Sequence, residues 1–291
     1  MFVDAAIGGV VRRLAASRPQ QERPSGRGLR LVDALPHATL DLHAHVLPGL
    51  DDGPATLEES LELLRDAAAD GITHVAATPH VREDFPTDPA EMEARVAELN
   101  RAASDAGIPV TVLPGGELDP AHLLGLDDAT LRRFGLGGNP DVLLVEFPYQ
   151  GWPLHLAEIV FRLQTRGFTV VLAHPERNAV VQDDPSRLDA FVDAGVLVQL
   201  TAASVDGRLG KAAQKAALAL ISRGCAHVVA SDAHVPAVRA TGLARAAASL
   251  RYPELARWLT CDVPGALLGG VPLPERPERR RSARRAAVLG A

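Results

Sequence analysis

The chain has 291 residues, a formal net charge of −6 and 47% hydrophobic residues, which suits one α/β barrel of roughly 250 residues with tails, or two average domains. The negative charge excludes bulk attraction to nucleic acid or acidic membranes, and 2 cysteines are too few for a disulfide framework. No apolar run approaches the roughly 20 residues that a membrane-spanning helix needs. We therefore expect a cytoplasmic protein with no transmembrane segment and no nucleic-acid partner.

Composition divides the chain into three regions. Residues 1–38 are predicted to be an N-terminal extension, in which Ser17–Gly28 is a linker rich in Pro, Gln, Arg and Gly. Residues 39–271 carry a repeated pattern and are predicted to form the folded domain. In the arginine-rich region 272–291, Pro272–Arg285 holds three prolines and six arginines. We predict a disordered, solvated tail there, and docking to an acidic partner or to nucleic acid is the alternative.

Within residues 39–271 a unit of helix, glycine, short apolar strand and polar residue recurs. Thr56–Glu59 is a capping box that opens a helix ending before Gly71, and Asp88 with Pro89 opens a helix that closes at Gly107. Strands are expected at Thr39–Leu42, Ile72–Thr78, Val110–Leu113, Val142–Val145, Thr169–Ala173, Val196–Leu200 and His227–Ala230.

Seven strands that alternate with helices or loops predict parallel β-structure with crossover helices, so the fold class is α/β. The apolar strand centres indicate burial on both faces. A doubly wound open sheet also fits this alternation. We favour a TIM-like (β/α)7 barrel, because candidate site residues follow six of the seven strands rather than one switch point.

Imidazole and carboxylate side chains gather at the predicted strand ends. His43 and His45 share one face of an extended chain, and Asp51 and Asp52 follow in the next turn. The candidate metal ligands are His43, His45, Asp52, His80, Glu117, Glu146, His174, Asp232 and His234. A single histidine at a strand end is usually a structural residue. Nine such groups at one barrel mouth, however, would be costly to desolvate without cations between them.

These ligands are too many for one ion and suggest two or three, of manganese, iron or zinc. No cysteine joins the set, so a structural zinc or iron–sulfur site is not expected. Ions roughly 3.5–4 Å apart suit phosphoryl transfer. Arg177 and Arg239, which follow His174 and His234, are candidate phosphate-binding residues, because a guanidinium can bind two phosphate oxygens. A surface ion pair is the alternative for each arginine.

These motifs resemble the PHP (polymerase and histidinol phosphatase) superfamily, and most closely its capsule-biosynthesis branch of bacterial manganese-dependent protein tyrosine phosphatases. The matching segments, in family order, are DLHAHVLPGLDDGPATLEES, GITHVAATPH, LPGGEL, LLVEFP, LAHPERN and VVASDAH. They cover roughly Thr39 to Gly270. The DDG after the two histidines, together with the EFP and HPERN segments, favours the phosphatase branch.

The resemblance implies a distorted seven-stranded barrel of the PHP type and three metal ions, with manganese favoured over iron or zinc. One ion would be held by His43, His45, Glu117 and Asp232. Glu117 would bridge to a second ion, held with Glu146 and His174, and the third would be held by Asp52, His80 and His234. Arg177 and Arg239 match the family's phosphate-binding arginines, the second by spacing alone. Thr201 departs from the pattern, because relatives commonly have Asn there.

The predicted function is a metal-dependent phosphomonoesterase that acts as a protein-tyrosine-phosphatase. The resemblance implies that its partner is a bacterial tyrosine kinase linked to exopolysaccharide or capsule synthesis. A small-molecule phosphatase, acting for instance on histidinol phosphate, could use the same site. A non-catalytic scaffold or adaptor is the alternative from another class, although the intact ligand set argues against it. The sequence is compatible with a monomer or an oligomer.

Overall fold

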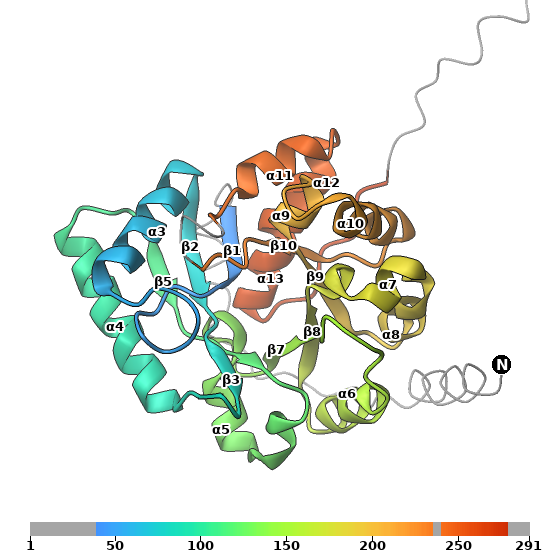
Figure 1. The fold of residues 1–291 in the computed structure, drawn as a ribbon, viewed down its shortest axis with the longest axis horizontal. Coiled ribbons are helices and arrows are strands. Elements are labelled where there is room, and N and C mark those ends of the chain that lie inside the picture. The colour runs from blue at the N-terminus through green and yellow to red at the C-terminus, as the bar shows by residue number, and fades with distance from the viewer. Residues whose placement is uncertain (1–38, 235–239, 279–291) are drawn as a thin grey trace, which may run out of the picture.

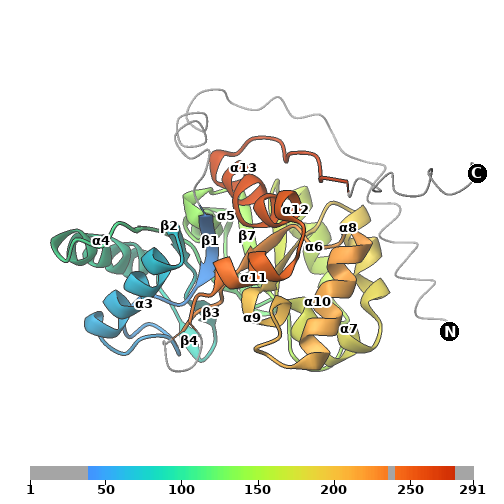
Figure 2. The same cartoon turned by 90° about the horizontal axis from the view of Figure 1, so that it is seen from above.

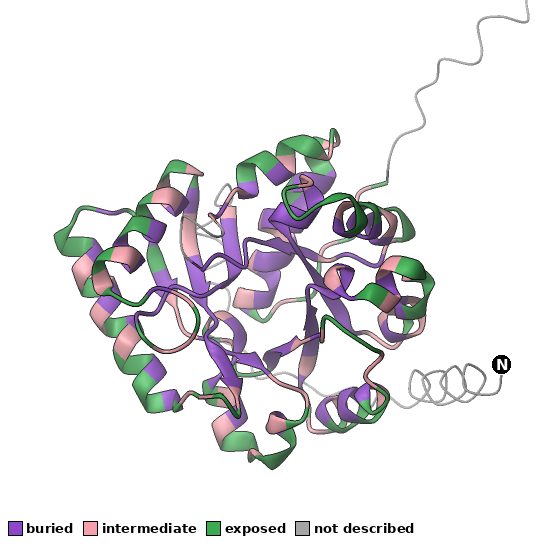
Figure 3. Ribbon diagram, viewed as in Figure 1, coloured by how far each residue is buried: buried purple, intermediate pink, exposed green. Residues whose placement is uncertain are grey.

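In the computed structural model, which describes residues 39–234 and 240–278, short strands occupy the interior and helices surround them (Figure 1). The strands are almost wholly buried, while the outer helices such as α3, α4 and α10 present exposed faces (Figure 3). Seen from above, α3 and α4 flank β1 and β2, whereas α6, α7, α8 and α10 lie on the other side of the molecule (Figure 2). The predicted α/β class with parallel strands is confirmed.

The strands form two sheets. The first has the order β1-β2-β5 and contains β1 (Thr39–Ala44), β2 (Ile72–Ala77) and β5 (Thr111–Leu113), all parallel. The second has the order β10-β9-β8-β7-β6-β3-β4 and contains β10 (Val228–Ala230), β9 (Leu197–Thr201), β8 (Thr169–Ala173), β7 (Val142–Glu146), β6 (Glu117–Leu118), β3 (His80–Arg82) and β4 (Phe85–Pro86). In this second sheet only the β3–β4 pair is antiparallel.

The described residues form helices of which the first two, at 57–69 and 89–105, lie where the sequence predicts them. They are α3 (Leu57–Ala69), α4 (Pro89–Asp105), α5 (Asp128–Arg133), α6 (Leu156–Thr165), α7 (Ala179–Asp183), α8 (Asp189–Asp193), α9 (Ala202–Val205), α10 (Lys211–Arg223), α11 (Leu243–Ser249), α12 (Pro253–Arg257) and α13 (Val263–Gly269). Short 3-10 turns lie at η1 (His122–Gly125), η2 (Leu136–Gly138), η3 (Pro175–Arg177) and η4 (Pro185–Leu188), and η5 (Trp258–Asp262) is a π-turn. Thr56 and Glu59 form the predicted capping box, and the Asp88 carboxylate accepts from the first amides of α4.

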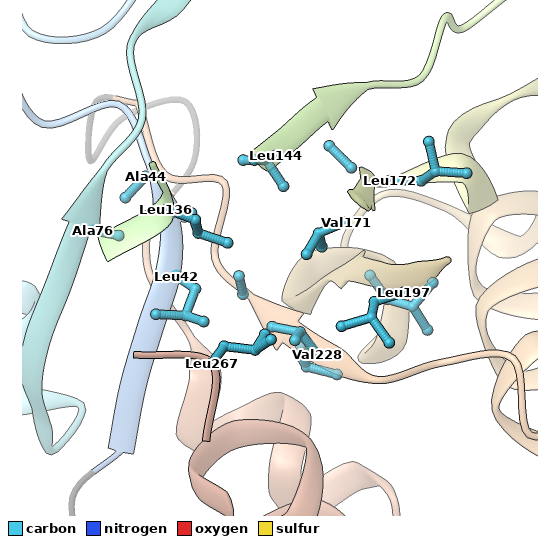
Figure 4. Packing of buried hydrophobic residues seen from close by; sticks show 14 of the residues in the cluster. Leu42, Ala44, Ala76, Leu136, Leu144, Val171, Leu172, Leu197, Val228 and Leu267 are labelled. Atoms are coloured by element: carbon cyan, nitrogen blue, oxygen red, sulfur yellow. The ribbon is translucent and has the colours of Figure 1, made fainter. Parts of the chain in front are cut away.

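Apolar side chains from both sheets and from α13 fill the interior. Leu144 of β7 lies opposite Val171 of β8 in the parallel register, and Leu42 and Val228 face the same space (Figure 4). Leu267 of α13 packs beside them. Burying such side chains supplies the main stabilisation of the fold, at about 25 cal/mol for each Å² of apolar surface. This packing leaves the carboxyl ends of the strands free to carry polar groups.

A closed seven-stranded barrel is not established by the strand pairing, because in residues 39–234 and 240–278 the ladders divide into two sheets. The first sheet meets the second where the Asp232 amide donates to the His43 carbonyl and the His45 amide donates to the Ala233 carbonyl, each at 2.7 Å. On the other side the chain itself crosses between the sheets. Pro79 separates β2 from β3, and a proline without an amide donor interrupts a ladder.

Because the chain crosses here, two predicted site residues lie in strands of the second sheet and not in loops. The sequence predicts His80 and Glu117 in the loop segments that follow the strands at 72–78 and 110–113. Each instead begins a new short strand of the second sheet, where the two residues lie opposite each other in the β3–β6 register. The strands are only 3 and 2 residues long, which is too short for an apolar pattern to reveal them.

Part of the predicted tail lies against the domain. The Trp258 indole donates to the Pro274 carbonyl at 3.1 Å, and the Arg276 guanidinium donates to the carbonyls of Ile221 and Ala226 at 2.6 and 2.9 Å. The predicted extension 1–38 and residues 279–291 lie outside the described residues, so the domain boundaries stay predictions. Across the described ranges, no helix has both the length and the apolarity needed to cross a bilayer.

Candidate metal centre

The structure brings the nine predicted metal ligands to one end of the strands. His43 and His45 come from the end of β1, Asp52 from the loop that follows, Glu146 from the end of β7, and His174 from the residue after β8. The others are His80 and Glu117 at the starts of β3 and β6, and Asp232 and His234 after β10. Most of these side chains are buried, while the Asp52 side chain is 49% exposed and Glu146 is 12% exposed.

Glu117 lies at the centre of the cluster. Its Oε2 atom is 3.4 Å from His43 Nε2, 3.4 Å from His45 Nε2 and 3.2 Å from His80 Nδ1. Its Oε1 atom is 2.9 Å from His174 Nε2. Glu117 Oε2 and His80 Nδ1 are buried atoms that form no hydrogen bond within the described part of the chain. One carboxylate therefore faces four imidazoles.

The spacing of these atoms fits a shared cation. Nitrogen and oxygen ligands lie about 2.0–2.2 Å from a divalent ion, so two ligands of one ion lie about 3.0–3.5 Å apart. His43 Nε2 and His45 Nε2 are 3.3 Å apart, and Asp232 Oδ1 is 3.6 Å from both. The lone pairs of two unprotonated imidazole nitrogens would repel each other at this distance, so a proton or a cation must lie between them. The donor set thus suits a metal ion.

A second group of ligands lies at the more exposed side. Asp52 Oδ1 is 3.2 Å from His234 Nε2, 3.6 Å from His80 Nε2 and 3.9 Å from His45 Nδ1. These four residues make one of three groups whose ligand atoms lie within 4.8 Å of one another; the other two are His43, His45 and Asp232, and His43, Glu117 and His174. Glu146 lies at the margin, with Oε2 3.8 Å from His80 Nδ1.

Two residues outside the predicted ligand set orient these histidines. Asp51 Oδ2 is 2.6 Å from His45 Nδ1 and also accepts from the His80 amide at 3.0 Å. Gln199 Oε1 lies 3.1 Å from His43 Nδ1 and accepts from the His174 amide. Such partners fix the tautomer and the ring direction of a ligating histidine. The adjacent Asp51 and Asp52 therefore differ: Asp51 orients His45, whereas Asp52 faces His80 and His234 as a candidate ligand. The sequence could not show this difference, because the two side chains are identical.

We expect Asp51→Asn to weaken manganese binding by about 10- to 100-fold, because the neutral amide orients His45 less well and lowers its basicity. Titration calorimetry of the full chain with manganese measures this loss. Asp189→Asn is a matched control, since that carboxylate pairs with Arg223 on the surface. Equal affinities for Asp51→Asn and the parent protein would show that Asp51 is not needed to orient the imidazole.

The cluster holds groups of both charges. Burial opposes protonation of His45, but the carboxylates of Asp51 and Glu117 outweigh it and hold its pKa well above the usual value. Burial likewise disfavours the charged form of Glu117, yet His43 and His174 hold its pKa well below the ordinary range. For His80 burial dominates and lowers the pKa to about 4. Because ligating imidazoles must be neutral, metal binding to His45 would release a proton.

Two of the candidate ligands occupy unusual backbone conformations. His174 has φ 38° and Asp232 has φ 52°, a left-handed region that non-glycine residues rarely adopt. Each follows a buried strand, and its side chain contacts the cluster, His174 at Glu117 and Asp232 at His43. Such conformations persist where the surrounding structure enforces them, and they cluster at functional sites.

Of the two predicted phosphate-binding arginines, Arg177 adjoins the cluster. Its Nη1 donates to Asp232 Oδ2 at 2.6 Å, and its guanidinium lies 4.4 Å from the centre of the Tyr149 ring. Arg239 lies outside the described residues. The sequence interpretation also missed Arg82, whose guanidinium is 3.4 Å from Glu146 Oε1.

Comparisons with known proteins agree with this geometry. The family model described as "Capsular polysaccharide synthesis, CpsB/CapC" matches residues 39–257. The tyrosine-protein phosphatase YwqE of Bacillus subtilis (strain 168) is 34% identical over 196 residues, which cover 67% of this chain and 77% of that protein. The tyrosine-protein phosphatase CpsB of Streptococcus agalactiae serotype V is 27% identical over 215 residues, covering 71% and 87%.

A solved structure is similar in three dimensions. It is one of the crystal structures of YwqE from Bacillus subtilis and CpsB from Streptococcus pneumoniae, which are described as unique metal-dependent tyrosine phosphatases. The TM-score is 0.75 at 30% sequence identity, and the match covers 83% of this chain and 100% of that chain.

Proposed function

Because the chain belongs to the CpsB/CapC family of capsular polysaccharide synthesis, we propose that it hydrolyses phosphotyrosine in a protein, with divalent metal ions in the buried cluster. It is a tyrosine-protein phosphatase of the metal-dependent type. The relatives YwqE and CpsB are tyrosine-protein phosphatases, and this chain matches 77% and 87% of their lengths.

The observation that carries the proposal is the position of Glu117 Oε2, which lies 3.2–3.4 Å from nitrogens of three different histidines. A buried carboxylate and several imidazoles at such distances are the donor set of a cation site. A scaffold would have no physical reason to maintain this arrangement, since desolvating these groups is costly.

We assign three ions to the cluster. His43, His45, Glu117 and Asp232 would hold the first, Glu117 would bridge to a second at Glu146 and His174, and Asp52, His80 and His234 would hold the third. The close approach of His234 and Asp52, at 3.2 Å, supports the third group. Imidazole and carboxylate donors without a thiolate favour manganese and also suit iron or zinc.

The chemistry divides between the ions and the chain. Divalent ions, when bound, supply Lewis-acid charge and acidify a water to a pKa of about 7. Arg177 supplies donors for the phosphoryl oxygens, where charge must be offset in the transition state. A tyrosyl leaving group has a pKa of about 10 and needs less help from a general acid than an alkyl alcohol does. We therefore assign no separate acid residue.

Three further proposals accompany this function. We propose that the two sheets together form the wall of a distorted barrel, supported by the hydrogen bonds from the His45 amide to the Ala233 carbonyl and from the Asp232 amide to the His43 carbonyl. We propose a tyrosine kinase of exopolysaccharide or capsule synthesis as the partner, supported by the description of the family model. We propose a cytoplasmic location, supported by the free thiols of Cys225 and Cys261.

The function is tested by phosphate release from a phosphotyrosine peptide and from histidinol phosphate, side by side, with added manganese. We expect clear preference for the peptide and loss of turnover with a chelator. Preference for histidinol phosphate would replace the proposal with a small-molecule phosphatase. Tight manganese binding without hydrolysis of either substrate would contradict the phosphatase assignment.

A further inference from the structure

Two arginine–aromatic pairs adjoin the metal-ligand cluster. The Arg177 guanidinium lies over the Tyr149 ring at 4.4 Å from its centre, and the Arg82 guanidinium lies over the Phe85 ring at 5.1 Å. Arg177 ends the short turn η3, whereas Arg82 and Phe85 face each other across the β3–β4 hairpin. The two pairs therefore come from distant parts of the chain, and in each of them a guanidinium lies over an aromatic ring.

Each ring is stacked on a histidine of the cluster. Tyr149 lies on His174, with ring centres 5.5 Å apart and planes inclined by 28°. Phe85 lies on His80, with ring centres 5.9 Å apart and planes inclined by 19°. His174 and His80 in turn approach the two oxygens of Glu117, at 2.9 and 3.2 Å. The two pairs thus flank the central carboxylate.

Each guanidinium is also held by a carboxylate of the cluster. Arg177 donates to Asp232 at 2.6 Å, and Arg82 lies 3.4 Å from Glu146 and also pairs with the exposed Asp84 at 2.8 Å. Each carboxylate turns its other oxygen to the cluster: Asp232 Oδ1 lies 3.6 Å from His43 and His45, and Glu146 Oε2 lies 3.8 Å from His80. Each arginine is therefore held beside the candidate metal ligands, where its remaining N–H donors are placed to receive an anion, and phosphate matches the guanidinium fork.

Exposure distinguishes Tyr149 from the other rings that contact arginines. Tyr149 is 41% exposed, whereas Phe168 and Trp258, which also lie under guanidinium groups, are 3% and 5% exposed. The buried rings belong to the core, and their arginines cover them. Tyr149 instead presents an aromatic surface to solvent next to Arg177. The ring contacts His174 and Arg177, and its exposed part lies beside the metal-ligand cluster, where it can contact an aromatic substrate group.

We propose that Tyr149 is the platform for the tyrosyl ring of the substrate and that Arg82 is a second guanidinium that contacts its phosphate, with Arg177 on the other side of Glu117. This inference rests on the proposed phosphatase function and names residues that determine its preference for aryl phosphates. Phe85 holds Arg82 in place through the cation–π contact and also packs on His80.

Binding of two non-hydrolysable phosphonates tests the proposal without turnover. Benzylphosphonate carries an aromatic ring and methylphosphonate does not, and calorimetry of the full chain with manganese gives both Kd values. We expect Tyr149→Leu to weaken benzylphosphonate binding by about 3- to 10-fold and to weaken methylphosphonate binding clearly less, because methylphosphonate loses only the contribution of the ring to the placement of Arg177. Arg82→Gln should weaken both by about 10- to 100-fold, because it removes a charged hydrogen bond to the phosphonate.

Matched controls come from the same chain. Phe161→Leu removes a ring that is 40% exposed on α6, and Arg166→Gln removes a guanidinium that pairs with Asp128 and contacts the Phe168 ring. Both should leave the two Kd values unchanged. Tyr149→Phe keeps the ring and should bind like the parent, while Arg82→Lys should recover only part of the affinity. These conservative variants keep the test valid if the larger changes impair folding.

Three results would overturn the proposal: a Tyr149→Leu protein that binds both phosphonates as the parent does, an equal loss for both, or unchanged affinities after Arg82→Gln. A parent protein that binds the two phosphonates equally would exclude the ring platform as well. Failure of the proposed function is a separate result, because it is measured as absent phosphate release from the phosphotyrosine peptide by the parent protein.

Discussion

Glu117→Gln is expected to reduce kcat for a phosphotyrosine peptide by at least about 100-fold. This is more than the loss typical of changing a residue that only orients a metal ligand. The substitution keeps the shape of the side chain but removes the charge that faces His43, His45 and His80 at 3.2–3.4 Å. The remaining carboxylates cannot replace it, because among residues 39–234 and 240–278 Glu117 is the carboxylate that contacts both the β1 histidines and His174. Steady-state kinetics and manganese titration should show a parallel loss.

Glu93→Gln is the appropriate control for this prediction. Its carboxylate receives two hydrogen bonds from Arg133 at 2.8 Å, but both side chains lie on the surface. Exposed pairs of this kind contribute about 0–1 kcal/mol, so turnover should be unchanged. His43→Ala provides a second test of the same centre. If Glu117→Gln and His43→Ala fold, as judged by circular dichroism, and keep full turnover, the metal assignment is wrong.

The fold was predictable where local chemistry decides it. The strand at Thr169–Ala173 has the predicted bounds because an apolar run lies between a glycine that ends a helix and a polar residue. The helix Lys211–Arg223 ends at Gly224, which adopts φ 81°, in the helix–glycine–strand order that the repeated unit predicts. The short strands at His80 and Glu117 were missed because their pairing is set by a distant partner, and two or three residues show no period.

The candidate site was predictable to the extent that it follows strand ends. Parallel strands bring their carboxyl ends together, so a list of polar residues after strands contained every residue of the three ligand groups. The resemblance to capsule-biosynthesis tyrosine phosphatases is confirmed by the family model. Gln199 was missed because it lies inside β9, in a run that reads as core. Tyr149 and Arg82 act through contacts between separate segments, which spacing along one segment cannot reveal.

Arg177→Gln is expected to lower kcat/KM for the phosphotyrosine peptide by about 100- to 1,000-fold, with most of the loss in kcat, because it removes a donor aimed at the developing charge. Arg177 is placed for this role by the Asp232 carboxylate at 2.6 Å and by the Tyr149 ring at 4.4 Å. Arg187→Gln is the matched control. Its guanidinium also lies over an aromatic ring, that of Trp152 at 5.5 Å, and pairs with Asp184 on the surface.

The lysine variant separates two roles that Arg177 could have. If Arg177 only neutralises Asp232, Arg177→Lys keeps the positive charge and should restore nearly full activity. If the planar fork binds two phosphoryl oxygens, lysine offers a single point charge and should leave most of the loss in place. We expect the second result, with manganese affinity close to that of the parent protein. Full rescue by lysine would assign Arg177 to the support of Asp232 and would leave phosphate binding to other residues.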